Sequence, residues 1–257
     1  MVEALAVASG KGGTGKTTAT LALGMALARE HDVTVVDTDT GMANLLFHAG
    51  LTDVDVTLHD LLVADRRAAL ADATYERFGM DIVPCGTSLE AFQAADPGRL
   101  RAVIADLAAD TDVLLLDSPA TLASRGAVLP IALADRLVLV AQPTIPAITD
   151  ALKVQEYGDA YGTGVAGVLF NQVHDPEDVD RVVERAGRYF EGPIVGTVPA
   201  DEAAREARRA GRPLLDHAPD SEAAAGFREA AAALETAPGD ADAFADRFRQ
   251  AVVPDPP

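Results

Sequence analysis

The stretch SGKGGTGKTT, residues 9–18, contains the residue types and spacing needed to bind phosphate. Residues 10–17 fit the pattern G-x-x-x-x-G-K-[ST], in which glycines let backbone N–H groups turn inward around phosphates and the next helix N-terminus adds positive potential. Lys16 would reach the β- and γ-phosphates, and the Thr17 hydroxyl would bind Mg²⁺. The residues expected to contact a nucleotide here are Gly10, Lys11, Gly12, Gly13, Thr14, Gly15, Lys16, Thr17 and Thr18.

Carboxylates follow two other apolar runs. Asp37 and Asp39 lie two residues apart after VV, so their side chains point the same way and both can face a metal ion and the terminal phosphate. Asp117 follows four apolar residues in VLLLDS, where a carboxylate can position metal-bound water beside Thr17. We therefore expect Thr17, Asp37 and Asp117 to form the Mg²⁺ site.

Seven apolar runs are the elements that must position these groups. Their continuous Val, Leu and Ile content indicates strands covered on both faces, and the helical patterns between them are long enough for parallel crossovers. This predicts a doubly wound α/β fold with a largely parallel sheet flanked by helices, whose ligand sits at the carboxyl ends of the strands. The expected strands span residues 4–9, 32–37, 80–86, 112–118, 136–142, 164–172 and 193–199.

Amphipathic segments predict the outer helices, and length and composition predict one α/β domain over residues 1–236. A turn at 237–240 then precedes a tail, 237–257, with a short amphipathic helix in which Phe244 and Phe248 lie one turn apart. Acidic residues offset the arginines of this tail, so a docked or frayed helix is favoured over a membrane anchor. The expected helices span residues 16–29, 146–160, 176–190, 201–210 and 219–236.

Lys11 distinguishes the phosphate loop from the ordinary pattern, which needs only one lysine. The chain has three lysines and places two of them in this loop. KGGTGKTT resembles the deviant Walker A motif of the MinD/ParA family of P-loop ATPases, and the chain is most similar to archaeal MinD-like proteins. The resemblance implies the P-loop NTPase fold and an ATP-sandwiched homodimer in which Lys11 reaches the partner's nucleotide.

Other segments extend the resemblance over residues 3–236. VVDTDTGMAN, residues 35–44, is similar to the MinD switch I segment, which implies that Asp39 orients the attacking water, Asp37 is an outer-shell partner of the metal and Asn44 is a further contact. FNQV and VPAD imply an adenine pocket lined by Asn171, Pro199 and Asp201. An asparagine at a strand end is also an ordinary turn residue, and that alternative stays open.

Thr121 departs from the family pattern. MinD proteins usually read D-S-P-A-G, whose glycine amide can approach the γ-phosphate, whereas this chain reads DSPAT at residues 117–121. The threonine could slow hydrolysis, alter the switch movement or be tolerated. The hydrolysis rate therefore stays open, while nucleotide binding is expected.

Composition excludes several functions. With 40 acidic and 21 basic residues the net charge is −19, which disfavours bulk DNA binding and resembles the acidic surfaces of proteins from high-salt cytoplasm. The single cysteine, Cys85, excludes a disulfide within the chain and the iron–sulfur carriers of the superfamily. The chain lacks 18 consecutive apolar residues and an export signal at its N-terminus, so we expect a cytoplasmic protein, with peripheral location at the membrane or cell pole left open.

These features predict an ATP hydrolase that uses ATP and Mg²⁺, dimerises with ATP and positions a cellular assembly through a protein partner or cargo adaptor. Such an assembly would be a division site, a polar array or a motility machine. Three alternatives remain: a slowly hydrolysing nucleotide-gated scaffold, a ParA-type partitioning ATPase and a metallochaperone ATPase.

Overall fold

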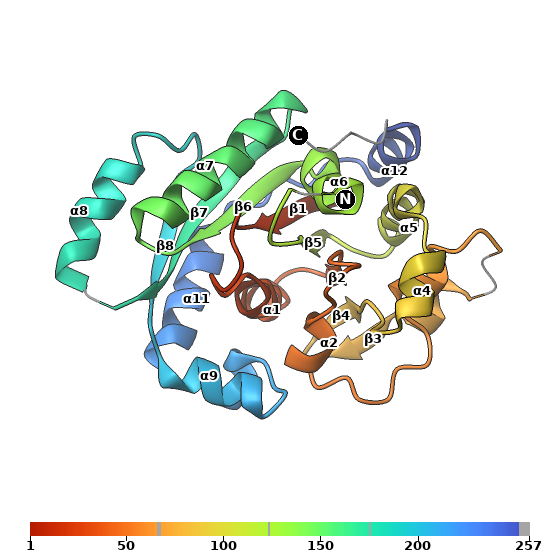
Figure 1. The fold of residues 1–257 in the computed structure, drawn as a ribbon, viewed down its shortest axis with the longest axis horizontal. Coiled ribbons are helices and arrows are strands. Elements are labelled where there is room, and N and C mark those ends of the chain that lie inside the picture. The colour runs from red at the N-terminus through yellow and green to blue at the C-terminus, as the bar shows by residue number, and fades with distance from the viewer. Residues whose placement is uncertain (66–67, 123, 175, 252–257) are drawn as a thin grey trace.

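A computed structural model describes residues 1–65, 68–122, 124–174 and 176–251. Within these residues eight strands form one sheet in the order β3-β4-β2-β5-β1-β6-β7-β8, with helices on both faces (Figure 1). Every neighbouring pair is parallel except β3 and β4. The strands are β1 (Glu3–Ala8), β2 (Val33–Asp37), β3 (Tyr75–Arg77), β4 (Met80–Val83), β5 (Val113–Asp117), β6 (Arg136–Ala141), β7 (Gly164–Val173) and β8 (Ile194–Pro199).

The doubly wound, mostly parallel fold predicted from the apolar runs is confirmed. All seven expected strands are present, and β3 is an additional short strand that pairs antiparallel with β4 at the edge of the sheet. Central strands are buried on both faces: in β5, Leu114 and Leu116 face one layer of the core, and Val113 and Leu115 face the other. This two-sided burial explains why the strands read as continuous apolar runs.

Helices cover the two faces of the sheet as separate layers. One layer contains α1 (Lys16–Leu27), α2 (Leu45–His48), α9 (Glu202–Arg209), α10 (Leu214–His217) and α11 (Glu222–Ala233). The other contains α3 (Leu58–Leu61), α5 (Leu100–Leu107), α6 (Arg125–Leu133), α7 (Ile145–Ala160), α8 (Pro176–Ala186) and α12 (Ala241–Gln250). The short helix α4 (Leu89–Ala94) lies outside these layers and has no buried residue.

Helix α12 is the amphipathic helix expected in the tail, and it packs against α5. Phe244 and Phe248 are 5% and 1% exposed, and their rings stack at 4.4 Å between centroids. The Arg247 guanidinium lies over both rings. The apolar face of this helix is thus covered by the domain. Val252 and the rest of the tail, 252–257, lie outside the described residues.

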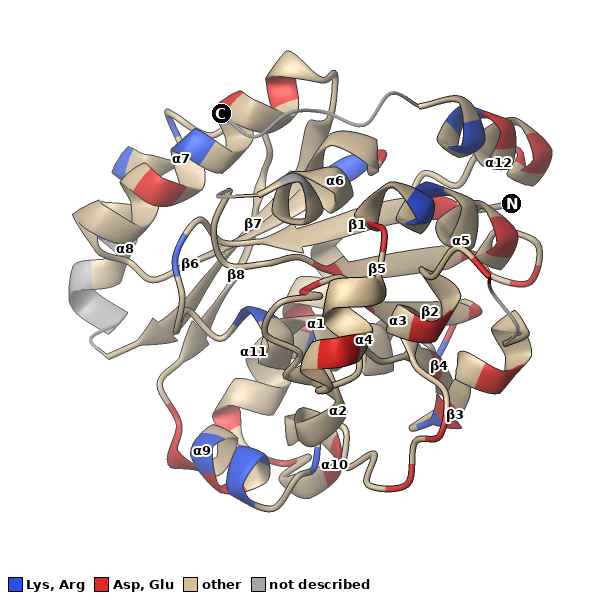
Figure 2. Cartoon of the chain, turned by 45° about the vertical axis from the view of Figure 1, so that its right-hand side comes forward, with Lys and Arg blue, Asp and Glu red and all other residues tan. Residues whose placement is uncertain are grey.

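Asp and Glu residues are spread over the outer helices and loops rather than gathered in one patch (Figure 2). None of the described helices is both long enough and apolar enough to span a membrane.

The order of the strands places the candidate chemistry at one edge. β1 lies between β5 and β6, and β2 is the next strand beyond β5. Asp37 and Asp117 are register partners at the ends of β2 and β5. The loop that follows β1 therefore meets both aspartates at the carboxyl edge of the sheet.

Candidate functional site

The loop after β1 depends on glycine at defined positions. Gly10, Gly13 and Gly15 have φ values of +65°, +82° and +85°, a region that other residues rarely adopt. A Cβ atom on Gly10 would overlap the carbonyl oxygen of Asp150, and one on Gly15 would overlap Nδ2 of Asn171. The turn can therefore close tightly against α7 and β7 only with these glycines.

Asp117 joins the start of α1 to the end of β5. Its Oδ1 accepts hydrogen bonds from Lys16 Nζ at 2.7 Å and Thr20 Oγ1 at 3.0 Å, and its Oδ2 accepts one from Thr17 Oγ1 at 2.7 Å. The Lys16 and Asp117 side chains are 8% and 2% exposed. The two residues expected to serve phosphate and metal thus form a buried ion pair beneath the loop.

Asp37 is fully buried on the neighbouring strand. Burial, and next the negative charge of Asp117, raise the pKa of Asp37 to about 8. Its carboxylate accepts hydrogen bonds from the backbone N–H groups of Asp39, at 3.1 Å, and Leu45, at 3.3 Å. Asp37 therefore shapes the backbone of the segment that follows β2.

Asp39 and Asn44 lie in that segment. Asp39 is half-buried, lines the cleft described below and accepts a hydrogen bond from the N–H of Met42 at 3.1 Å. Asn44 is exposed, lines the same cleft and donates to the Met42 carbonyl at 2.7 Å. Both residues predicted for this segment thus reach the cleft.

The oxygen atoms around Thr17 suit Mg²⁺. Its hydroxyl and the carboxylates of Asp37 and Asp117 are hard oxygen ligands, which Mg²⁺ combines with phosphate oxygens and water rather than with a complete protein cage. No group of three or more His, Cys, Asp or Glu residues able to hold a metal occurs in the described part of the chain. The Thr14 hydroxyl, 1% exposed in the loop, has no hydrogen-bond partner among the described residues. The unpaired buried hydroxyl of Thr14 and the small number of oxygen ligands around Thr17 fit a Mg²⁺–nucleotide complex, in which phosphate and water supply the other ligands.

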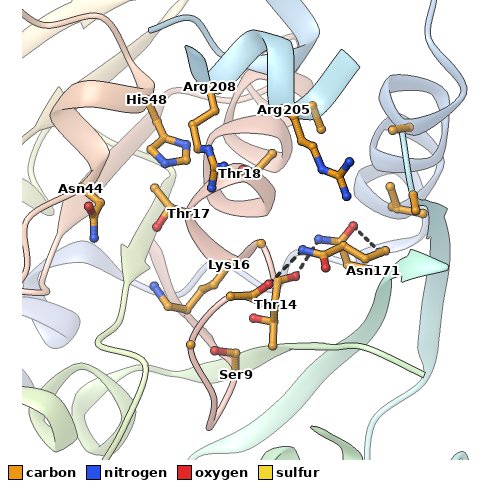
Figure 3. A pocket seen from close by; sticks show the side chains of 18 of the residues that line it. Ser9, Thr14, Lys16, Thr17, Thr18, Asn44, His48, Asn171, Arg205 and Arg208 are labelled. Atoms are coloured by element: carbon orange, nitrogen blue, oxygen red, sulfur yellow. Dashed lines mark hydrogen bonds between the residues drawn. The ribbon is translucent and has the colours of Figure 1, made fainter. Parts of the chain in front are cut away.

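A cleft of about 520 Å³ opens above the loop (Figure 3). It is bounded by the loop, the segment after β2, the end of β7 and helices α9 and α11, and its volume is in the range of small-molecule sites. Its lining includes all the predicted loop contacts except Gly10, together with Asp39, Asn44, Asn171, Pro199 and Asp201. The structure thus brings the predicted phosphate and adenine residues to one cavity.

The end of β7 holds the loop from the side. Asn171 donates from Nδ2 to the Thr14 carbonyl at 2.8 Å, and the next residue, Gln172, donates from Nε2 to the Gly13 carbonyl at 3.0 Å. Gln172 has a φ of +56°, and its N–H donates to Oδ1 of Asn171 at 2.9 Å. Asn171 thus supports the loop as well as lining the cleft. Sequence inspection missed Gln172, whose unusual backbone leaves no compositional signal.

Pro199 and Asp201 lie at and just after the end of β8, the strand that pairs with β7. Asp201 is the N-cap of α9, where Oδ1 accepts from Ala203 N–H at 2.9 Å and Oδ2 accepts from Ala223 N–H at 3.4 Å. It therefore ties the starts of α9 and α11 together. Phe227 of α11, which is 1% exposed, also lines the cleft.

Lys11 and Thr121 are both exposed. Lys11 is among the residues that line the cleft, and its ammonium forms no hydrogen bond or ion pair with the described residues. Thr121 does not line the cleft, although its neighbour Ala120 does. The threonine therefore leaves the cavity itself unobstructed.

Several residues near the cleft were not predicted. Arg205 and Arg208 reach it from α9, and His48 from α2 (Figure 3). His59, 1% exposed in α3, has Nε2 3.0 Å from the Thr40 carbonyl and so supports the segment next to Asp39. Histidines and arginines on helices of an acidic protein read as ordinary surface residues, so no sequence pattern singled them out.

Comparisons with known proteins agree with this geometry. The family model for the CobQ/CobB/MinD/ParA nucleotide binding domain matches residues 5–214. An uncharacterized ATP-binding protein of Methanocaldococcus jannaschii is 39% identical over 236 residues, covering 91% of this chain and 88% of that protein. The septum site-determining protein MinD of Pyrococcus horikoshii, solved with Mg-ADP, has a TM-score of 0.79 and 33% identity, covering 90% of this chain and 95% of that chain. The cell division ATPase MinD of Pyrococcus furiosus has a TM-score of 0.81 and 33% identity, covering 91% of this chain and 98% of that chain. The chain belongs to the CobQ/CobB/MinD/ParA family of nucleotide-binding proteins.

Proposed function

We propose that the protein is a Mg²⁺-dependent ATPase that dimerises when it binds ATP and separates after hydrolysis. The observation that carries this proposal is the phosphate loop, which buries Lys16 beside Asp117 while leaving Lys11 exposed on the lining of the same cleft. Lys16 is positioned for the nucleotide of its own subunit. The Lys11 ammonium has no hydrogen-bond or ion-pair partner among the described residues of its own chain.

Lys16, Thr17 and the loop N–H groups would bind the triphosphate, and Lys16 would exchange its contact with Asp117 for phosphate oxygens. Thr17 and Asp117 would hold Mg²⁺, and Asp37 would be an outer-shell partner of the ion. When bound, Mg²⁺ neutralises charge on the β- and γ-phosphates. Asp39, which faces the cleft, would orient the attacking water.

Lys11 would act on the nucleotide of the partner subunit. An ammonium that reaches phosphate only across a dimer interface stabilises the charge that develops during hydrolysis. This arrangement makes hydrolysis depend on dimerisation, because each site is incomplete without the other copy.

Asn171, Pro199 and Asp201 would hold the adenine at the other end of the cleft. Asn171 has one amide N–H on the Thr14 carbonyl, which leaves its second N–H for the base. Phe227 supplies an apolar surface in the same cavity.

We further propose that the ATP cycle positions a cellular assembly through a protein partner or cargo adaptor, in the cytoplasm or peripherally at the membrane or cell pole. The similar Pyrococcus furiosus protein is a cell division ATPase, and a MinC:MinD complex from Aquifex aeolicus, 25% identical, has a TM-score of 0.76. Docking of α12 on α5 favours a location away from lipid, and liposome flotation that required residues 240–257 would favour the membrane instead.

The other functions are less well supported. Exposed Thr121 in place of the family glycine favours a slowly hydrolysing scaffold as the second candidate. The net charge of −19 disfavours a ParA-type partitioning ATPase that binds bulk DNA. A metallochaperone ATPase would need a metal site formed between two copies.

Light-scattering mass in high-salt buffer tests the proposal. The protein should double its mass with Mg-ATP and remain a monomer with Mg-ADP. A monomer in both conditions would contradict the dimerisation switch and favour the scaffold.

A further inference from the structure

Arg208 is an arginine of α9 that faces the cleft. Its side chain extends toward Thr18, on the first turn of α1, and lies beside His48 of α2 (Figure 3). The same three residues also line a second, much smaller cavity, together with residues of α1 and α9. Arg208 thus approaches the turn that presents the phosphate loop, from an element far away in the sequence.

The neighbouring arginines of this region are paired with carboxylates, whereas Arg208 is not. Arg205 Nη1 lies 2.8 Å from Glu202 Oε2, Arg209 Nη1 lies 3.4 Å from Glu202 Oε1, and Arg212 Nε lies 2.7 Å from Asp216 Oδ2. The Arg208 guanidinium makes no hydrogen bond or ion pair with the residues that the structure describes. In a chain with 40 acidic residues, an arginine that faces a cavity without a carboxylate is suited to an anion from solution.

The charge of the cleft supports the same conclusion. Although the protein carries a net charge of −19, basic side chains outnumber acidic ones on this lining. The basic residues are Lys11, Lys16, Arg205 and Arg208, and the acidic residues are Asp39 and Asp201. The cavity therefore favours a ligand with several negative charges.

His48, which lies beside Arg208, does not add a second positive charge at neutral pH. Burial lowers the pKa of His48; the negative charge of Asp117 opposes this shift, and the positive charges of Arg208 and Lys16 add to it. The imidazole is thus neutral beside the guanidinium. Of the two described arginines that reach the cleft from α9, Arg208 is thus the cation without a carboxylate partner, because Arg205 pairs with Glu202.

We propose that Arg208 binds the phosphate groups of the nucleotide, donating from its guanidinium in α9 while Lys16 donates from the loop. This inference rests on the proposed nucleotide-binding function and adds a residue that lies outside the loop. The planar guanidinium can give two parallel hydrogen bonds to phosphate oxygens. Because Asp201 fixes the start of α9 against α11, the contact would join the phosphate end of the site to its adenine end.

Isothermal titration of ATP, ADP and adenosine into the full chain tests this role. Arg208→Gln should raise the Kd of ATP and ADP about tenfold or more, the loss expected for a hydrogen bond to a charged group, without changing the affinity for adenosine. Arg209→Gln is the matched control, because it removes an arginine next to Arg208 that pairs with Glu202. This control should bind all three ligands as the wild type does. Thermal unfolding without nucleotide checks that both variants fold.

The outcomes separate the two proposals. If the wild type binds ATP and Arg208→Gln binds it equally well, the role of Arg208 is overturned and the proposed function stands. An equal loss of adenosine affinity would also overturn it, because the arginine would then shape the cleft rather than contact phosphate. A wild type that binds neither ATP nor ADP would overturn the proposed function as well.

Discussion

Lys16 Nζ lies 2.7 Å from Oδ1 of Asp117, and this ion pair is buried where the phosphate loop meets β5. The contact joins residues that are 101 positions apart in the sequence. It holds the lysine extended beneath the loop, so the side chain is already ordered before phosphate arrives. The pair therefore contributes both to folding and to the organisation of the site.

Lys16→Met should destabilise the nucleotide-free protein by about 3 kcal/mol, because it leaves Asp117 buried without a counter-charge and close to Asp37. Adding Asp117→Asn should recover much of this loss, since the double variant buries no unpaired charge at this position. Urea unfolding of the two single variants and the double variant measures the coupling. If the double variant loses the sum of the unfolding free energies lost by the two single variants, the two side chains do not stabilise each other.

Lys11→Ala should bind ATP as the wild type does but lose ATP-dependent dimerisation and hydrolysis. The side chain is exposed and makes no hydrogen bond or ion pair with the described residues, so its removal has little to disturb within one subunit. Light scattering with Mg-ATP, together with phosphate release, measures both effects. Lys153→Ala is the matched control, because Lys153 is exposed on α7 and its ion pair among the described residues is with Asp150. Dimerisation retained by Lys11→Ala would contradict the role of this lysine across the interface.

Asp39→Ala should reduce steady-state phosphate release to the background rate while leaving the ATP-bound dimer intact. The reason is that Asp39 faces the cleft, and its described hydrogen bond is accepted from the backbone of its own segment. Equal low rates for wild type and variant would instead favour the nucleotide-gated scaffold.

Phe248→Ala should destabilise the protein by about 3–5 kcal/mol, because it removes a buried aromatic ring between α12 and α5. The ring also lies 5.2 Å from the Arg247 guanidinium. Arg249→Ala on the exposed side of the same helix should cost less than about 1 kcal/mol. Urea unfolding compares the two, and equal effects would show that α12 contributes little to the stability of the domain.

Asp81→Asn should raise the melting temperature at neutral pH more than at pH 3. Burial raises the pKa of Asp81, and the charges of Glu76, its cross-strand partner, and Asp32 raise it further. Since the folded-state pKa exceeds the unfolded value, the protonated carboxyl favours folding at low pH, and this contribution is lost as pH rises through the folded pKa. Calorimetry at both pH values measures the difference, with exposed Asp53→Asn as the control. A gain that is larger at pH 3 would contradict this assignment.

The strands and the phosphate loop could be predicted because their physical causes are local. Strands buried on both faces need continuous apolar runs, and the backbone of the loop needs glycine at positions 10, 13 and 15. Strand β3 was missed because an edge strand of three residues, none of them buried, has no such run. The predicted boundaries of α9 and α11 lie within three residues of those in the structure, whereas the predicted helix 176–190 ends at Ala186.

The remaining features depend on contacts between distant segments. The direction of Arg208 follows from the docking of α9 over α1, and the loop contact of Gln172 follows from the pairing of β7 beside β6. The support that His59 gives to Thr40 arises where α3 folds against the segment after β2. None of these relationships is encoded in spacing along the chain.

The pairing of Asp37 with Asp117 at the ends of β2 and β5 limits which length changes the protein can accept. Successive residues in a strand face opposite sides of the sheet, so inserting or deleting one residue within either strand would turn that carboxylate toward the other helical layer. Natural and engineered length variation should therefore concentrate in connections without buried residues, such as the one between α1 and β2. Alignments of this chain can be anchored on the two strands without gaps.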